Sequence, residues 1–344
     1  MSKYPNNFYK LRELTTNFFR QHAILKPRLI VAVSGGIDSV MLAHTLHSLQ
    51  TELGWQLTLC HIDHGLRKSS TRDAEFVQEF ADSLNLPLAL YKAPTKLKNE
   101  NLESWAREVR YSFLNRCLVE NSANFIVTAH HKLDQVETFL FKLLSGRVLT
   151  QGRCIREIDE QRKIIRPFLQ ADKELINQAF QECGLKFVQD ETNFDQKRTR
   201  NLIRYDLIAK LKTDYNKNIV QTLADIATKL SLDENFIETS VQNILSALEP
   251  KQTKSGNFKS ADLAKFSSAV LWRLLRQIAT NQIGEDAQKL GYKAYNILAE
   301  AIFAAKPHPQ TFDLGQNITA TISKKNGVGF KSNPPPIIRV VNQK

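Results

Sequence analysis

The most informative segment of this 344-residue chain reads Leu29-Ile30-Val31-Ala32-Val33-Ser34-Gly35-Gly36-Ile37-Asp38-Ser39. Its first five residues are apolar, and three of them are Val or Ile, which is typical of a buried β-strand. The two adjacent glycines that follow allow the backbone to turn tightly and to approach a ligand closely. Apolar residues beyond Asp38 recur at helical spacing, so the segment predicts a strand, a glycine turn and the start of a helix.

This order of elements directs backbone N–H groups and the positive end of a helix toward one point, which suits a phosphate or pyrophosphate. The alternative is an ordinary turn in which Asp38 or Ser39 caps the helix. The segment is neither an ATPase P-loop, because no Gly-Lys-Ser/Thr follows, nor a dinucleotide fingerprint, because the third glycine is missing. We therefore predict a phosphate-binding turn formed by Ser34, Gly35, Gly36, Ile37, Asp38 and Ser39.

The composition is 42% apolar and 24% charged, which is ordinary for a soluble globular protein of two domains. No apolar run approaches the length of a signal sequence or membrane span, so we predict a cytoplasmic protein with no membrane association.

The four cysteines are scattered without a Cys-x-x-Cys pair, which argues against a zinc ribbon or an iron–sulfur site. A net charge of +12 favours a partner rich in phosphates, although a basic surface that only aids solubility is the alternative.

The first half of the chain alternates strand and helix patterns. Strands are predicted at 29–34, 56–62, 88–91, 125–128 and 163–168, and helices at 38–50, 70–84, 102–120, 134–144, 172–183 and 199–212. This alternation predicts an α/β fold with a mostly parallel, doubly wound sheet. Ligands bind such sheets beyond the carboxyl ends of the strands, where the strand order reverses, and the glycine turn lies at such an end.

Helical patterns dominate from residue 216 to residue 305, and the segments 311–321 and 328–331 alternate weakly like a hairpin. We therefore predict a catalytic α/β domain over residues 1–215. A mainly helical domain with a short basic tail is predicted over residues 216–344.

Polar residues follow the second predicted strand, at the same edge of the sheet as the glycine turn. They are His61, Asp63, His64 and Arg67. The two histidines suit a hydrogen-bonded loop or a metal site, but no third metal ligand has convincing spacing. We favour an adenosine pocket shaped by His61 and Asp63.

Two further clusters carry charge on predicted helices. Arg107 and Arg110 share one helix face, where they either pair with solvent-exposed glutamates or neutralise a phosphate. His130, Asp134 and Glu137 have offsets of four and three and predict a site for acid–base work or for binding Mg²⁺ or an ammonium group. Helix capping by Asp134 is the alternative, and both functions can hold together.

A basic helix face forms the last cluster. Arg200, Asn201 and Arg204 lie on that face, opposite an apolar face that includes Leu202 and Ile203. A solvent-exposed basic helix with no binding function is one interpretation. We favour the other, in which the apolar face packs on the core and the basic face binds phosphates.

Six motifs occur in one order along the chain. They are Ser-Gly-Gly-x-Asp-Ser, His-x-Asp-His-Gly-Leu-Arg, Ala-Arg-x-x-Arg-Tyr, Ala-His-His-x-x-Asp-Gln-x-Glu-Thr, Arg-Pro-Phe-Leu, and Asp-x-Thr-Asn with Arg-Asn-x-x-Arg. The first resembles the pyrophosphate loop (PP-loop) of N-type ATP pyrophosphatases, and the whole set closely resembles the bacterial tRNA(Ile)-lysidine synthases. The resemblance covers residues 28–212 strongly and extends more weakly to about residue 330.

The resemblance implies a two-step reaction with ATP and Mg²⁺. ATP adenylates the C2 oxygen of the wobble cytidine in a tRNA(Ile) with a CAU anticodon, and the side-chain amine of free L-lysine then displaces AMP. The product, lysidine, pairs with A, so the tRNA changes from methionine to isoleucine identity and from AUG to AUA reading.

The resemblance also implies roles for the residues above. Asp38 would hold Mg²⁺, and Arg110 would steady the phosphates or the adenylated base. His130, Asp134 and Glu137 would gather lysine and take its proton, since an amine with a pKa of about 10.4 must lose a proton before it attacks. The tRNA would be held by Arg200, Asn201 and Arg204.

One loop departs from the family pattern. Members commonly carry Arg-Gly-x-Gly-x-x-Gly-Leu after the Glu-Thr helix, whereas residues 145–153 here lack the leading Arg and the middle glycine. How this loop handles tRNA or lysine is therefore left open. The chain ends before the extra C-terminal domain of longer members. We therefore expect that the acceptor end of the tRNA is bound by a simpler site or by the basic tail.

Three other functions share some of these features. A PP-loop tRNA thiolase generally needs paired cysteines, and synthetases for GMP or NAD share the loop but need no basic helical domain. A basic RNA-binding protein with a vestigial ATP site conflicts with the intact Ser34, Asp38 and Ser39. The sequence does not fix the oligomeric state and leaves a homodimer open.

Overall fold

The computed structural model describes residues 4–63, 65, 70–94, 102–145, 154–188, 199–248, 257–304, 306–323 and 327–332. The chain forms two compact units, the first comprising Met1–Phe141 and Cys154–Thr228 and the second Lys142–Arg153 and Lys229–Lys344. Within the described residues, no helix combines the length and apolar character that a membrane span requires.

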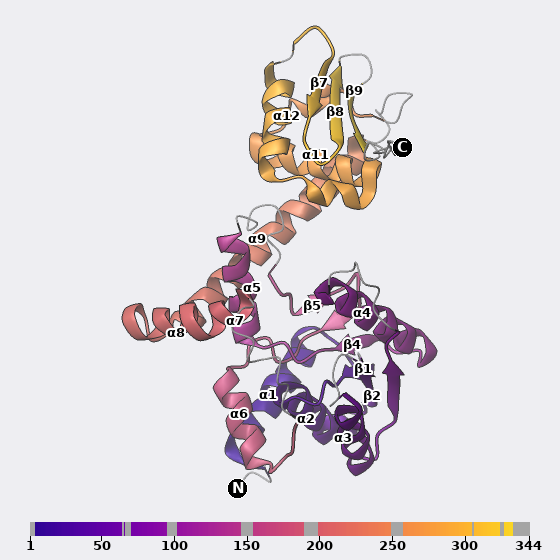
Figure 1. The fold of residues 1–344 in the computed structure, drawn as a ribbon, viewed down its shortest axis with the longest axis vertical. Helices are drawn as coiled ribbons and strands as arrows, with labels where there is room; N and C mark the ends of the chain where they lie inside the picture. The colour runs from indigo at the N-terminus through magenta and orange to yellow at the C-terminus, as the bar shows by residue number, and fades with distance from the viewer. Residues whose placement is uncertain are drawn as a thin grey trace, which may run out of the picture. The chain divides into compact units, whose positions relative to one another are not determined.

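A six-stranded sheet lies at the centre of the first unit (Figure 1). Its strands are β1 (Arg28–Ala32), β2 (Gln56–Asp63), β3 (Leu88–Lys92), β4 (Phe125–Val127), β5 (Ile158–Asp159) and β6 (Ile164–Ile165). The order is β3-β2-β1-β4-β6-β5, and only the pairing of β5 with β6 is antiparallel among these described strands. The predicted mostly parallel sheet is confirmed, and the strand order reverses between β1 and β4.

Helices cover both faces of this sheet. They are α1 (Asn6–Gln21), α2 (Ile37–Leu53), α3 (Ser70–Ser83), α4 (Leu102–Glu120) and α6 (Lys173–Glu182). The helix α5 (Lys132–Leu144) packs instead with residues that follow residue 202. Leu29 and Val31 of β1 pack in one apolar cluster with residues of α1, α2, α3 and α6. Ile30, which points to the other face, packs in a second cluster with residues of α4. The alternation along β1 therefore confirms the doubly wound arrangement.

The first helix was not predicted. Buried Phe8, Leu11, Phe18 and Phe19 recur along α1 at spacings that place them on one side of a helix. They pack in the same cluster as α2 and α6, so α1 completes one layer of the fold.

The basic region after residue 198 is helical but irregular. It comprises α7 (Thr199–Leu202), a π-helical turn η2 (Ile203–Leu207), α8 (Ile208–Lys210) and a second π-helical turn η3 (Leu211–Tyr215). Ile203 and Ile208 pack against Val136 and Leu140 of α5. This packing places the basic helix beside the start of α5.

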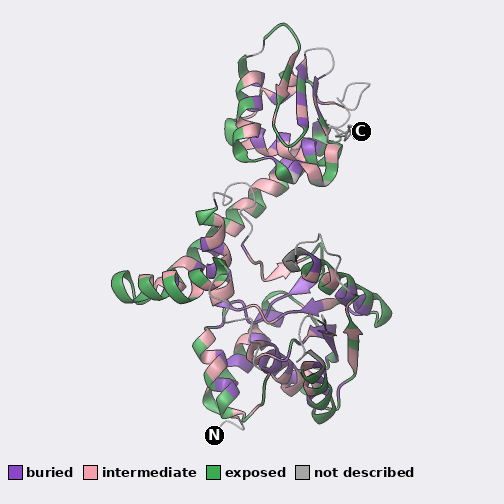
Figure 2. Ribbon diagram, viewed as in Figure 1, coloured by how far each residue is buried: buried purple, intermediate pink, exposed green. Residues whose placement is uncertain are grey.

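The second unit combines helices with a small sheet. After α9 (Ile219–Leu248), whose first residues belong to the first unit, come α10 (Ser260–Leu263), α11 (Ser268–Ile283), the 3₁₀ helix η5 (Gly284–Lys289) and α12 (Tyr292–Ala304). The strands β7 (Gln310–Asp313), β8 (Ile318–Ser323) and β9 (Gly327–Ser332) form an antiparallel sheet, one strand more than the hairpin predicted. The core of the second unit includes Leu275, Leu298 and Ile318. Figure 2 shows that both the helices and the sheet of this unit contribute buried residues.

Candidate active site

The glycine turn joins β1 to α2 in a conformation that needs glycine. Gly35 has φ +89°, a region that other residues rarely adopt. Gly36 is the extended N-cap residue of α2, and no side chain caps this end. The alternative of a turn capped by Asp38 or Ser39 is therefore wrong, and the first N–H groups of α2 stay available to a ligand.

Two serine hydroxyls shape the inside of the turn. Ser39 Oγ accepts a bond of 3.1 Å from the Ser34 N–H, lies 3.1 Å from Ser34 Oγ and donates to the Gly36 carbonyl at 2.9 Å. Ser39 is buried, whereas Ser34 is exposed. Hydrogen bonds of Ser39 thus connect the two ends of the predicted Ser34–Ser39 segment, and the Ser34 side chain stays exposed.

The end of β2 supports this turn. His61 is buried, and its Nδ1 lies 2.8 Å from the Val33 carbonyl. Burial lowers the pKa of His61, so the imidazole is neutral at neutral pH. Asp63 is also buried and accepts a bond of 2.8 Å from the Gly65 N–H. His64 and Arg67 lie outside the described residues.

Asp38 is held by two side chains from other parts of the sheet edge. The Lys173 ammonium donates to its Oδ1, and Nε2 of His131 lies 3.7 Å from its Oδ2. Burial alone would raise the pKa of Asp38, but the neighbouring His131 ring and the Lys173 ammonium outweigh it and hold the pKa at about 2. Asp38 is therefore a stable anion at the first turn of α2. The sequence prediction named neither Lys173 nor His131 as a site residue.

The start of α5 differs from the prediction. The helix begins at Lys132, so His130 lies before it and does not share a helical face with Asp134 and Glu137. His130 instead meets Thr128, with Oγ1 and Nδ1 2.9 Å apart. Burial lowers the pKa of His130 to about 4, and the charge of Asp134 opposes this only in part. Asp134 accepts a bond of 3.0 Å from the His131 N–H, so it serves the helix N-terminus as the capping interpretation foresaw.

Asp134 and Glu137 converge on one cation. Arg204 in η2 donates through Nη2 to Asp134 at 3.0 Å and through Nε to Glu137. Glu137 is buried, and burial raises its pKa although the Arg204 guanidinium offsets part of the effect. The two carboxylates therefore form a cation site, and this chain's own Arg204 occupies it. Arg204 was predicted on the tRNA-facing side, whereas the structure turns it toward the carboxylates.

Among the remaining predicted residues, Arg110 lies close enough to His130 for its charge to lower the pKa of that histidine. Arg110 and Arg200 are exposed, and Asn201 is half-buried. Arg107 stacks on Tyr111, with the guanidinium carbon 5.0 Å from the ring centroid. Residues 146–153, which include most of the atypical loop, and the Asp-x-Thr-Asn motif lie outside the described residues.

The donor set fits Mg²⁺ only through Asp38. Within the described part of the chain, no group of three or more His, Cys, Asp or Glu residues could hold a metal ion alone. Mg²⁺ commonly binds one or two carboxylates together with substrate phosphates. Asp38, in the first turn of the helix that follows the glycine turn, has the chemistry of such a single protein ligand.

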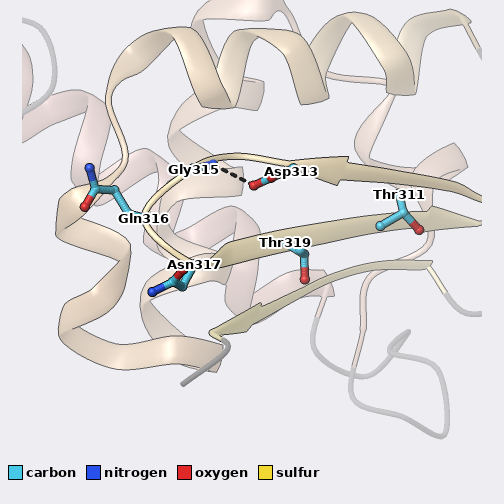
Figure 3. A pocket seen from close by; sticks show the side chains of 6 residues that line it. All are labelled: Thr311, Asp313, Gly315, Gln316, Asn317 and Thr319. Atoms are coloured by element: carbon cyan, nitrogen blue, oxygen red, sulfur yellow. Dashed lines mark hydrogen bonds between the residues drawn. The ribbon is translucent and has the colours of Figure 1, made fainter. Parts of the chain in front are cut away.

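The second unit contains an open hollow of about 580 Å³ at the β7–β8 turn (Figure 3). Its lining is Thr311, Asp313, Gly315, Gln316, Asn317 and Thr319. This lining contains no Lys, Arg or His side chain that would bind a phosphate. The glycine turn is therefore the better candidate for the active site.

Comparison with known proteins agrees with this geometry. The PP-loop domain family matches residues 6–211. A tRNA(Ile)-lysidine synthase from Nostoc sp. is 30% identical over 87% of this chain and 84% of its own length. The chain belongs to the PP-loop family of tRNA(Ile)-lysidine synthases.

Other lysidine synthases align over the PP-loop unit. The synthase from Thermotoga sp. is 36% identical over 63% of this chain, which spans 53% of that relative's length. The chain thus spans about half the length of this lysidine synthase. The U34-tRNA thiolase NcsA from Methanococcus maripaludis has a similar fold, with a TM-score of 0.58, 15% identity and coverage of 65% of this chain and 80% of its own.

Proposed function

We propose that this protein joins L-lysine to C2 of the wobble cytidine in tRNA(Ile) with a CAU anticodon, after adenylation of that base by ATP. One observation carries the proposal. A pyrophosphate-type turn ends at Asp38, and His131 links Asp38 to a carboxylate pair that already holds a basic side chain. A nucleotide site and a lysine site thus meet at one sheet edge. ATP use also follows from membership of the family.

In the first step, the turn would receive the departing pyrophosphate. Its free N–H groups and the Ser34 hydroxyl donate hydrogen bonds to phosphate oxygens, and these bonds strengthen as negative charge develops on the leaving group. Asp38 would hold Mg²⁺, which neutralises phosphate charge when bound. His61 and Asp63 would shape the adenosine side, and Arg110 would steady the phosphates or the adenylated base.

In the second step, Asp134 and Glu137 would bind the ammonium group of lysine. The amine must lose a proton before it attacks C2. Glu137 suits this task better than His130, because burial raises the pKa of Glu137 whereas it lowers that of His130 to about 4. We therefore propose that Glu137 accepts the proton of the lysine ammonium and that His130 helps to position the lysine.

The tRNA would lie along the basic helix and the second unit. Arg200 is exposed on α7, and the net charge of +12 favours a polyanionic partner. The guanidinium of Arg204 would contact both the Asp134–Glu137 carboxylates and the tRNA. We place the reaction in the cytoplasm and leave a homodimer as a prediction that sedimentation analysis can test.

The test is incubation of the protein with an unmodified tRNA(Ile) transcript bearing CAU, ATP, Mg²⁺ and labelled lysine. Label on the tRNA with one AMP per lysine is expected. A matched transcript with U in place of the wobble cytidine should take no label. Binding of RNA without AMP formation, or lysine-independent incorporation of sulfur, would contradict the proposal.

A further inference from the structure

Lys173 reaches the glycine turn from a distant part of the chain. It is the first residue of α6, and its ammonium donates to Oδ1 of Asp38, which lies 135 positions earlier. The Lys173 side chain is 29% exposed and that of Asp38 is 33% exposed. Both groups are therefore accessible to a ligand at the first turn of α2.

Structural stability alone gives little reason for a lysine at this position. A cation at the N-terminus of a helix is opposed by the helix dipole. A partly exposed ion pair contributes little to the free energy of unfolding. By contrast, Lys132, at the start of α5, is buried and bonded to both Asp172 and Gln221, as a structural lysine should be.

Charge at the turn gives a better reason. The Ser34 and Ser39 hydroxyls and the backbone N–H groups are neutral, and Asp38 is an anion that repels phosphate. Among the described side chains that contact Asp38, Lys173 is a cation and His131 is an imidazole. An ammonium has three donors, so two remain after the bond to Asp38.

We infer that Lys173 binds the β- and γ-phosphates of ATP, and then the released pyrophosphate, from its position beside Asp38. The inference rests on the proposed function, because it assumes that the turn receives the triphosphate. Lys173 would thus compensate the negative charge that Asp38 brings to the turn. The adenosine and the α-phosphate, which AMP retains, would not depend on it.

Binding of three ligands tests this inference. The affinities of ATP, inorganic pyrophosphate and AMP, each with Mg²⁺, are measured by calorimetry for the wild-type protein, Lys173→Met and Lys173→Arg. Lys173→Met should weaken binding of ATP and pyrophosphate at least tenfold and leave AMP binding unchanged, and Lys173→Arg should restore most of the loss. Lys10→Met, which removes an exposed lysine of α1, should change none of the three affinities.

The outcomes separate the inference from the function. Unchanged ATP and pyrophosphate affinities in Lys173→Met would overturn the inference alone, and an equal loss for AMP would do the same by indicating a distorted pocket. A wild-type protein that binds pyrophosphate through Lys173 but makes no lysidine would overturn the proposed function alone. Failure of the wild-type protein to bind ATP would overturn both.

Discussion

Nε2 of His131 lies 3.7 Å from Oδ2 of Asp38, and the opposite ring nitrogen lies 3.5 Å from Oδ2 of Asp134. The imidazole side chain is 2% exposed. It therefore connects the anion at the glycine turn with the carboxylate pair at the start of α5. The nucleotide and lysine sites of the proposed reaction share this one side chain.

Replacing His131 should lower stability. His131→Leu removes the buried imidazole that lies between Asp38 and Asp134, and we expect a loss of about 0.5–3 kcal/mol in the free energy of unfolding. Urea denaturation measures it. His22→Leu is the control, because His22 pairs with Glu157 at a partly exposed site, and it should change the value by less than about 0.5 kcal/mol. Equal effects of the two substitutions would show that His131 contributes no more to stability than a histidine at a partly exposed site.

Removing Arg204 should make stability depend on pH. In Arg204→Met the buried Glu137 loses its cation, so its pKa should rise further above the ordinary value. A raised folded-state pKa gives stability that is present at low pH and is lost as the pH increases through that pKa. The variant should therefore lose about 2–4 kcal/mol at pH 8 and clearly less at pH 5.

The matching double variant identifies the cause. Arg204→Met combined with Glu137→Gln carries no buried charge at this position, so it should recover much of the stability at pH 8 and lose the pH dependence. A double variant as unstable as Arg204→Met would assign the loss to packing instead.

The low pKa of His130 also predicts an effect of acid. Its folded-state pKa of about 4 lies below the ordinary value of 6.5, so the unfolded chain binds the proton first as the pH falls. Stability should therefore decline between about pH 6.5 and pH 4. Melting temperatures across this window should fall less steeply in His130→Asn than in the wild-type protein. Parallel curves would show that His130 is not held neutral.

Most of the sheet could be predicted from the sequence, because its strands and helices have clear periodicity. The helix Leu102–Glu120 has the predicted bounds, and β1 differs from its prediction by one residue at the start and two at the end. The helix α1 was not predicted, although Phe8, Leu11, Phe18 and Phe19 have helical spacing.

The contacts within the site could be predicted only where they are local. The bond between Ser34 and Ser39 spans five positions, so it lies within the turn that the sequence predicts. The bond from Lys173 to Asp38 and that from Arg204 to Glu137 join residues 135 and 67 positions apart. No periodicity encodes such pairs, because they depend on how α6 and η2 pack against the sheet edge. His131 was overlooked in favour of His130 because the helical offsets were counted from residue 130, whereas α5 begins only at Lys132.

Gly35 should be essential for nucleotide binding. With φ +89°, a Cβ would be strained even though the nearest atoms lie at ordinary contact distances of 3.6 and 3.7 Å. Gly35→Ala should cost about 1–2 kcal/mol of stability and weaken ATP binding, because the turn must change its course. Gly54→Ala provides the comparison, since Gly54 has φ +68° at the far end of α2. It should cost stability without changing ATP affinity, and a loss of affinity in both variants would point to general damage.

Arg200 should contribute to tRNA binding through charge. It is exposed on α7, and each phosphate that a cation neutralises releases condensed counterions. For Arg200→Ala, the slope of log affinity against log salt concentration should become shallower by about 0.7–0.9. Filter binding between low and moderate salt measures this slope. Arg20→Ala, which removes an exposed arginine in the last turn of α1, should leave the slope unchanged. If the two variants have the same slope, the phosphate contact must be assigned to another part of the basic surface.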